Sequence, residues 1–308
     1  MPDRRLVEEV AAALGTRPGL VEKDWHVVRA IGVIASVNAA GMIPAFSGGT
    51  SLSKGWQLIK RFSEDIDFKV SEPIGISASR ARRERTAYRE RILEALGTAG
   101  FEPVEEPLVR DVSRFFSADL AYDAEFGAGQ GLRAHIRVEM SFEAPVLPPA
   151  PRAIGSLIAL AQREPPEVAS FPCVDPVETA ADKLSALAWR VLMRDRTRPK
   201  DDPTIIRHLH DLAALERQAA AAPGFAKLVL AAAAADEGRG GAPAADPATM
   251  FGEMLRRLES DPLWAREYED FVRQVSFAGI GEEIEFAAAL AACTRIIAAV
   301  PRAGMTRK

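Results

Sequence analysis

Hydrophobic and polar residues alternate strictly over residues 65–70 and again over 135–142. A repeat of two residues is typical of a β-strand that buries one face, because successive side chains point to opposite sides. In the first segment the polar face carries Asp65 and Asp67, and in the second it carries Glu139. Apolar segments bounded by turn residues predict further strands over 43–46, 101–104 and 112–121.

A repeat of three to four residues predicts α-helices in most of the remaining chain. The predicted helices before residue 100 span 4–14, 21–40, 50–60 and 79–97. After residue 176 the pattern is almost wholly helical, with predicted helices over 176–194, 203–222, 224–235, 247–258, 262–276 and 281–300.

A proline-rich segment at 145–151 separates these two patterns and predicts a domain boundary. The expected organisation is a first domain over 1–150 and a second, mainly α-helical domain over 151–308. The expected fold class is α+β, with a mixed sheet and flanking helices in the first domain. The chain has 308 residues, of which 48% are hydrophobic, so it is long enough for each domain to bury a core.

The net charge of the chain limits the kinds of binding partner that it can attract. The net charge is −4 at pH 7, so there is no general attraction for nucleic acid, and any such contact must come from a local basic patch. Six arginines between residues 80 and 91 form a candidate patch that could contact RNA phosphates or an acidic partner. Glutamates are interleaved with these arginines, which favours a salt-bridged, solvent-exposed helix face over such contacts.

The cysteines and the apolar segments indicate the cellular compartment in which the protein is expected. Cys173 and Cys293 lack the spacing of a zinc site or a disulfide framework, which favours a reducing cytoplasm. The N-terminal residues form no apolar signal segment. The apolar stretch at 286–300 is interrupted by Thr294 and Arg295 and is too short to cross a membrane. We therefore expect a cytoplasmic protein without a membrane partner.

Asp65 and Asp67 stand two residues apart on a predicted strand, so both carboxylates project to the same side. Two like charges at this spacing repel each other unless a cation lies between them. Ligands that offer only oxygen favour Mg²⁺ or Mn²⁺. Taken alone, however, the pattern also describes a strand with an acidic solvent face, and such short motifs occur often by chance.

A Gly48-Gly49 turn between a predicted strand and a predicted helix changes this balance. Glycines let backbone N–H groups approach a phosphate closely. Thr50 or Ser51 then opens the predicted helix, whose N-terminus favours anions. The glycine spacing fits neither a P-loop nor a Rossmann fingerprint. Together with the acidic strand, the turn predicts a site for a triphosphate and its metal ion.

These residues belong to a longer pattern, which reads FSGGTSLSK over 46–54 and RFSEDIDF over 61–68, with Glu22-Lys23-Asp24-Trp25 upstream. The pattern resembles the AbiEii/AbiGii-type nucleotidyltransferase toxins of the DNA polymerase β superfamily, from about Val21 to Asp211. The resemblance implies an enzyme that transfers NMP from an NTP to an acceptor hydroxyl, with a tRNA 3′ end as the leading acceptor. It also implies a cognate antitoxin as partner.

Two alternatives to this function stay open. The acceptor hydroxyl could belong to a protein or to a small molecule such as an antibiotic. The chain could instead be a nucleotide-binding partner of an antitoxin that acts without catalysis. A pure binding module, however, has little use for two mutually repelling acids.

The resemblance also implies roles for individual residues. Glu139 is the candidate third carboxylate, which would help Asp65 and Asp67 hold the metal and would assist deprotonation of the acceptor. Asp119 and Asp123 are its rivals, and Glu139 could instead be an exposed strand carboxylate paired with Arg137. The residues implied to bind the nucleotide are Gly48, Gly49, Thr50, Ser51, Lys54, Arg61 and Ser63.

Two further implied residues lie in the helical domain, which would thereby complete the active site. Lys183 would neutralise nucleotide phosphates, and Asp211 would position this lysine or the substrate. Lys183 could equally be a surface lysine, and Asp211 could form a helix ion pair with Arg207. Lys54 and Arg61 could likewise be solvated helix charges.

Overall fold

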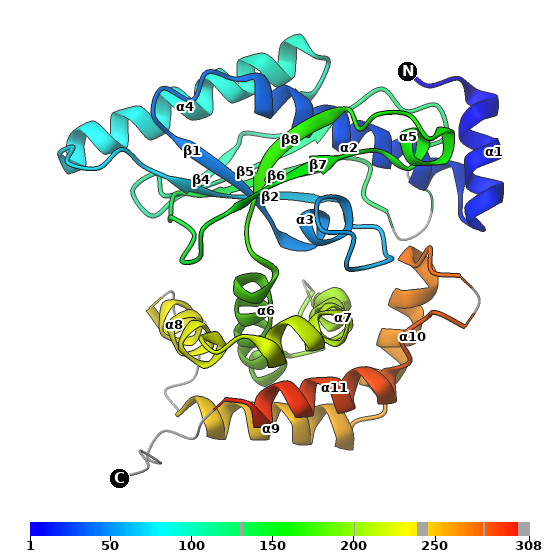
Figure 1. The fold of residues 1–308 in the computed structure, drawn as a ribbon, viewed down its shortest axis with the longest axis vertical. Coiled ribbons are helices and arrows are strands. Elements are labelled where there is room, and N and C mark those ends of the chain that lie inside the picture. The colour runs from blue at the N-terminus through cyan, green and yellow to red at the C-terminus, as the bar shows by residue number, and fades with distance from the viewer. Residues whose placement is uncertain (128, 130–131, 200, 239–245, 280, 301–308) are drawn as a thin grey trace. The chain divides into compact units, whose positions relative to one another are not determined.

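The computed structural model describes residues 1–300 except 128, 130–131, 200, 239–245 and 280 (Figure 1). The chain forms two compact units, Met1–Asp175 and Pro176–Lys308. The first unit contains a mixed sheet with helices, and the second is α-helical in the described residues, as the predicted α+β fold class requires.

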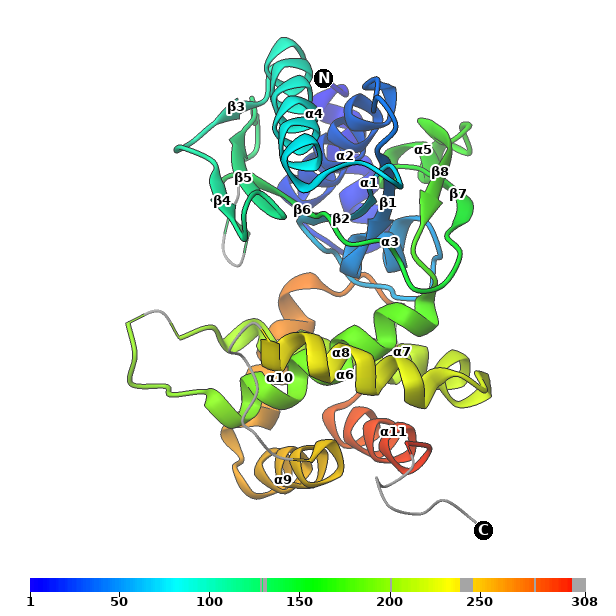
Figure 2. The same cartoon turned by 90° about the vertical axis from the view of Figure 1, so that its left-hand side faces the viewer.

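The sheet of the first unit has the strand order β3-β5-β6-β2-β1-β8-β7, and β4 pairs with β5 at one edge (Figure 2). Strand β2 is parallel to β6, and β1 is parallel to β8, whereas the other neighbours are antiparallel. The strands are β1 (Ile43–Ser47), β2 (Asp65–Ser71), β3 (Glu102–Pro103), β4 (Leu108–Arg110), β5 (Phe115–Ala121), β6 (Ile136–Ser141), β7 (Ala150–Ile154) and β8 (Val168–Cys173).

Helices α2 (Pro18–Ser36) and α4 (Ala78–Thr98) lie along one face of the sheet (Figure 1). Their apolar stripes bury Ile31 and Ile92 in one core with Phe68 and Val138, which come from the inward positions of β2 and β6. The alternation seen in the sequence is therefore the alternation between this core and the opposite face. The remaining helices of the unit are α1 (Arg4–Leu14), α3 (Gly48–Lys54) and α5 (Leu157–Gln162).

Most predicted elements of the first unit are present, but several bounds differ. Helix α2 begins at Pro18 and ends at Ser36, with Val37 as its C-cap, whereas the sequence predicts a helix over 21–40. Helix α3 begins at Gly48 and ends at Lys54, whereas the sequence predicts a helix over 50–60.

The strands β4, β7 and β8 and the helix α5 were not predicted. Proline explains two of these omissions, because it cannot donate a ladder hydrogen bond and therefore argues against a strand. Pro151 lies in β7, which is an edge strand, and Pro172 lies in β8. The first compact unit extends beyond the proline-rich segment at 145–151, since both strands join its sheet.

In the second unit, α6 (Pro176–Met193) packs against α7 (Arg207–Ala221), α8 (Phe225–Gly238) and α9 (Pro247–Ser260) (Figure 1). The predicted helix over 203–222 is divided into a 3₁₀ turn (Pro203–Ile206) and α7. Helices α10 (Leu263–Val275) and α11 (Phe286–Ala298) complete the unit. Among the described residues, no helix combines the length and apolar character that crossing a membrane requires.

Candidate active site

Three predicted acids lie on one face of the sheet, on two neighbouring strands. Strand β2 carries Asp65 and Asp67 at alternating, partly exposed positions. Strand β6 runs parallel to it in a register that pairs Asp67 with Glu139 and Asp65 with Arg137. Because paired residues of adjacent strands point to the same face, Glu139 stands beside Asp67. The structure therefore places the three carboxylates that the sequence singles out on the same face of the sheet.

The surroundings of Glu139 show that negative charge is concentrated on this face. Ser117 of β5 donates a hydrogen bond from its Oγ to Glu139 Oε1 over 3.3 Å. Burial raises the pKa of Glu139 above its ordinary value, and the negative charge of Asp65 raises it further. A carboxyl group in this situation favours either a proton or a nearby cation.

The chemistry of these donors fits a hard divalent cation. Asp65, Asp67 and Glu139 offer only carboxylate oxygens, which are the ligands that Mg²⁺ and Mn²⁺ prefer. In the described part of the chain, no group of three or more His, Cys, Asp or Glu side chains is already gathered as a metal site. A positive charge lies next to Asp65, since Arg133 Nη1 is 2.9 Å from Asp65 Oδ1.

The Gly48-Gly49 turn lies directly against these acids. Gly48 has a φ of +72°, and a Cβ atom at this position would lie 1.9 Å from Asp67 Oδ2. A Cβ atom on Gly49 would lie 2.8 Å from Arg61 Nη2 and 2.9 Å from Ser63 Oγ. Neither position has room for a side chain, so the backbone approaches Asp67, Arg61 and Ser63 closely. One local cluster therefore contains the glycine turn, Asp67, and the predicted nucleotide-binding residues Arg61 and Ser63.

Thr50 and Ser51 are buried within α3. The Thr50 hydroxyl contacts the backbone oxygens of Ser63, at 3.2 Å, and of Asp65. These contacts attach α3 to the beginning of β2 and so fix the position of Asp65. The Thr50 hydroxyl therefore stabilises the fold, a role that the sequence does not reveal.

Lys54 is also buried and forms an ion pair with Asp24 of α2, which is fully buried. The other carboxylate oxygen of Asp24 accepts a hydrogen bond from the backbone N–H of Leu157 over 2.7 Å. Burial raises the pKa of Asp24, while the charge of Lys54 opposes this rise. The alternative interpretation of Lys54 as a solvated helix charge is therefore wrong, and its predicted contact with the nucleotide stays a prediction.

Asp24 belongs to a run of three buried charges on α2, and each member holds a different segment. Glu22 accepts hydrogen bonds from the backbone N–H groups of Glu125, over 2.6 Å, and Phe126, over 3.0 Å. Lys23 contacts the carboxylate of Glu64, immediately before the first acid. The motif Glu22-Lys23-Asp24 is thus a scaffold for the segments around the acidic strand.

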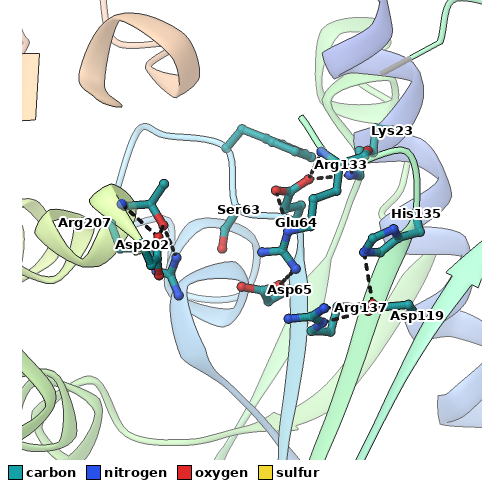
Figure 3. A network of polar contacts seen from close by, with 12 residues as sticks. Lys23, Ser63, Glu64, Asp65, Asp119, Arg133, His135, Arg137, Asp202 and Arg207 are labelled. Atoms are coloured by element: carbon teal, nitrogen blue, oxygen red, sulfur yellow. Dashed lines mark hydrogen bonds and ion pairs between the residues drawn. The ribbon is translucent and has the colours of Figure 1, made fainter. Parts of the chain in front are cut away.

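A network around Glu64 connects this scaffold to Asp65 (Figure 3). Arg133 contacts Glu64 through Nε over 3.2 Å and Asp65 through Nη1 over 2.9 Å. Its backbone N–H donates to Glu64 Oε2 over 3.1 Å, and its backbone oxygen accepts from Lys23 Nζ over 2.7 Å. The sequence gives no signal for Arg133, because it lies in an irregular segment before β6.

Asp119, one rival for the third carboxylate, is engaged elsewhere on the same face. Both of its oxygens accept hydrogen bonds from Arg137, over 2.7 and 2.8 Å, and His135 Nε2 lies 3.2 Å from Oδ2. The hydrogen bond from Arg137 is the main reason that the pKa of Asp119 is lowered. Arg137 therefore pairs with Asp119, and Glu139 keeps its place beside Asp67.

The two candidate residues of the second unit contact each other. Lys183 of α6 places its Nζ 2.7 Å from Asp211 Oδ2 of α7, and Asp211 is fully buried. His210 Nδ1 lies 3.4 Å from the other oxygen of Asp211. Asp211 is thus positioned to orient Lys183 within this unit.

Comparison with known proteins identifies the family. Residues 38–292 match the model of the nucleotidyl transferase AbiEii toxin family of type IV toxin–antitoxin systems. The fold is similar to that of MenT4, a nucleotidyltransferase toxin from Mycobacterium tuberculosis, with a TM-score of 0.60 and 18% sequence identity over 97% of this chain and 90% of that chain. A sequence comparison with curated proteins gives no significant match. Since the family match spans most of the chain, the protein belongs to the AbiEii nucleotidyltransferase toxins of type IV toxin–antitoxin systems, which transfer a nucleotidyl group from an NTP.

Proposed function

We propose that the protein transfers NMP from an NTP to the 3′-terminal hydroxyl of tRNA, with Mg²⁺ or Mn²⁺ held by Asp65, Asp67 and Glu139. The observation that carries this proposal is the parallel register of β2 and β6, which sets Glu139 beside Asp67 on the face that also carries Asp65. Three carboxylates on one face provide the charge and the oxygen donors that a metal–triphosphate complex requires.

In the proposed reaction, the acceptor oxygen forms a bond to the α-phosphorus of the NTP. The bond from this phosphorus to the bridging oxygen breaks, and pyrophosphate leaves with that oxygen. The proton of the acceptor hydroxyl passes to the carboxylate of Glu139, which stands on the same sheet face as Asp65 and Asp67. When bound, the divalent cation supplies Lewis-acid stabilisation of the charge on the phosphates.

The nucleotide-binding roles divide according to the contacts of each residue. Arg61 and Ser63 lie against Gly49, so we propose that these three residues contact the phosphates. Gly48 keeps the space that Asp67 needs. Lys183 is proposed to add positive charge for the phosphates, and Asp211 is proposed to orient it. Thr50, Ser51 and Lys54 support the site by holding α3 in place.

For a tRNA acceptor, α4 offers a small basic surface. Of its arginines, Arg85 is buried against Glu72, and Arg80 pairs with Glu84. Arg82 and Arg83 are exposed. A patch of this size suits weak phosphate contacts that depend strongly on salt, in keeping with a chain whose net charge is −4.

The test is transfer of label from α-³²P-labelled NTPs to tRNA in the presence of Mg²⁺ or Mn²⁺. Periodate-oxidised tRNA, which lacks the 3′-terminal diol, serves as the matched acceptor. The proposal predicts labelling of intact tRNA and none of oxidised tRNA. Equal labelling of the two would contradict a 3′-terminal acceptor. Label on a protein or a small molecule, with none on tRNA, would favour the alternative acceptors.

Type IV membership implies a cognate antitoxin. We propose that the reaction and its neutralisation take place in the cytoplasm, where NTP and tRNA are available and where the buried thiols of Cys173 and Cys293 stay reduced.

A further inference from the structure

We propose that Arg133 occupies the position of the divalent cation at Asp65 in the metal-free protein, and that the incoming cation must displace it. This inference rests on the proposed metal site at Asp65, Asp67 and Glu139. Arg133 then sets how readily the protein binds the metal.

The first support is the way in which the guanidinium spans two carboxylates. Nη1 lies 2.9 Å from Asp65 Oδ1, and Nε lies 3.2 Å from Glu64 Oε1 (Figure 3). The planar fork of an arginine can hold both acids at once, which the single ammonium of a lysine cannot do with the same geometry. A metal ion that coordinates Asp65 Oδ1 competes for the oxygen that Nη1 contacts.

The second support is the fixed backbone of residue 133. Its N–H donates to Glu64 Oε2 over 3.1 Å, and its carbonyl oxygen accepts from Lys23 Nζ over 2.7 Å. Lys23 has a fully buried side chain and also pairs with Glu64. The backbone is therefore held independently of Asp65, so the guanidinium can release Asp65 while Glu64 still binds it.

The third support is the partial exposure of the side chain. The Arg133 side chain as a whole is 30% exposed, although the Nη1 atom that faces Asp65 is buried, so a guanidinium that leaves Asp65 has a route towards water. By contrast, the ion pair between Lys54 and Asp24 is enclosed and has no comparable exit. Of these two cations, Arg133 is thus the one with a path for release.

The fourth support is electrostatic. Asp65, Asp67 and Glu139 place three carboxyl groups on one face, where the charges of Arg133 and Arg137 act on them. Replacing the guanidinium of Arg133 by a divalent cation adds one positive charge next to these acids. The exchange therefore lowers the repulsion among the acids, which provides its driving force.

The test is titration of the full-length protein with Mn²⁺ alone, without nucleotide, with free Mn²⁺ followed by electron paramagnetic resonance. Arg133→Gln is expected to bind Mn²⁺ about tenfold more tightly than the wild type, because the competing charge is gone. Arg133→Lys, which keeps the charge without the fork, is expected to fall between them. Arg4→Gln is the matched control, since Arg4 pairs with Glu125 in the same segment, and its affinity should equal that of the wild type.

Asp65→Asn separates this inference from the metal site on which it rests. Loss of Mn²⁺ binding in Asp65→Asn supports the site, and the ratio between Arg133→Gln and the wild type then decides the role of Arg133. Equal affinities of these two proteins would overturn the inference and leave the metal site standing. Absence of Mn²⁺ binding in every variant would overturn both. Thermal unfolding of each variant confirms that it is folded.

Discussion

The buried ion pair between Lys54 and Asp24 offers a test of whether Lys54 binds the nucleotide or stabilises the fold. Lys54 is 8% exposed and Asp24 is fully buried. Removing one partner of such a pair leaves an uncompensated charge and costs about 3–5 kcal/mol. We therefore expect Asp24→Asn and Lys54→Met each to lower the free energy of unfolding by about 3–5 kcal/mol.

The double variant should cost less than the sum of the single variants, because neither charge is then left alone. We expect a coupling energy of about 2 kcal/mol in the double-mutant cycle. The stability cost of Lys54→Met should also become smaller as the pH is lowered. Loss of Lys54 removes the charge that opposes the raised pKa of Asp24, so Asp24 is protonated more readily. A protonated Asp24 is neutral and can be buried at lower cost.

The assay is urea denaturation of the four proteins at pH 8 and pH 5.5, combined with nucleotide KM values for those that remain folded. In thermal unfolding, each single variant should lower the Tm by about 10 °C for a unit of this size. Additive costs in the cycle would refute the argument. So would a Lys54→Met protein of wild-type stability whose KM for NTP is raised manyfold, because Lys54 would then serve the nucleotide.

The remaining predictions concern pH and the glycine turn. The buried ring of His26 has its pKa lowered to about 4 by desolvation, so the folded state binds fewer protons than the unfolded state below pH 6.5. Stability should therefore fall by up to about 3 kcal/mol as pH falls from 6.5 to 4, and His26→Phe should flatten this dependence in pH-resolved denaturation. Gly48→Ala places a Cβ atom against Asp67 and should lower kcat about a hundredfold. Gly15 is the control, because it has a similar φ of +63° and no atom near the position of a Cβ. Gly15→Ala should lower stability and leave kcat unchanged. Equal kcat values for these two variants would show that the approach to Asp67 is not required.

The two acidic strands could be predicted from the sequence because burial of one face leaves a direct two-residue repeat. The repeat places Asp67 and Glu139 on polar faces, but it does not state that β2 and β6 are neighbours or how they are aligned. Register depends on the packing of the whole sheet. The family resemblance supplied Glu139 as a candidate, and the parallel register then explains why this acid stands beside Asp67 while Asp119 pairs with Arg137.

Roles that depend on partners distant in sequence could not be predicted. Lys54 has the spacing of a solvated helix charge, and only the fold brings Asp24 to it. Thr50 has the position of a phosphate-binding hydroxyl, but its hydroxyl contacts backbone oxygens at the beginning of β2. Arg133 lies outside any periodic element, so no pattern distinguishes it from other surface arginines. In each case the missing information is a tertiary contact.

The central claim is that Asp65, Asp67 and Glu139 together form the catalytic centre. The most direct measurement compares the rate of nucleotidyl transfer from α-³²P-labelled NTP by Asp67→Asn with that by Asp119→Asn. Both variants replace a carboxylate on the same sheet face, but only Asp67 stands beside Glu139 and Gly48. The account predicts that Asp67→Asn lowers the rate at least about a thousandfold and that folded Asp119→Asn stays within about tenfold of the wild type. Comparable rates for the two variants would contradict it.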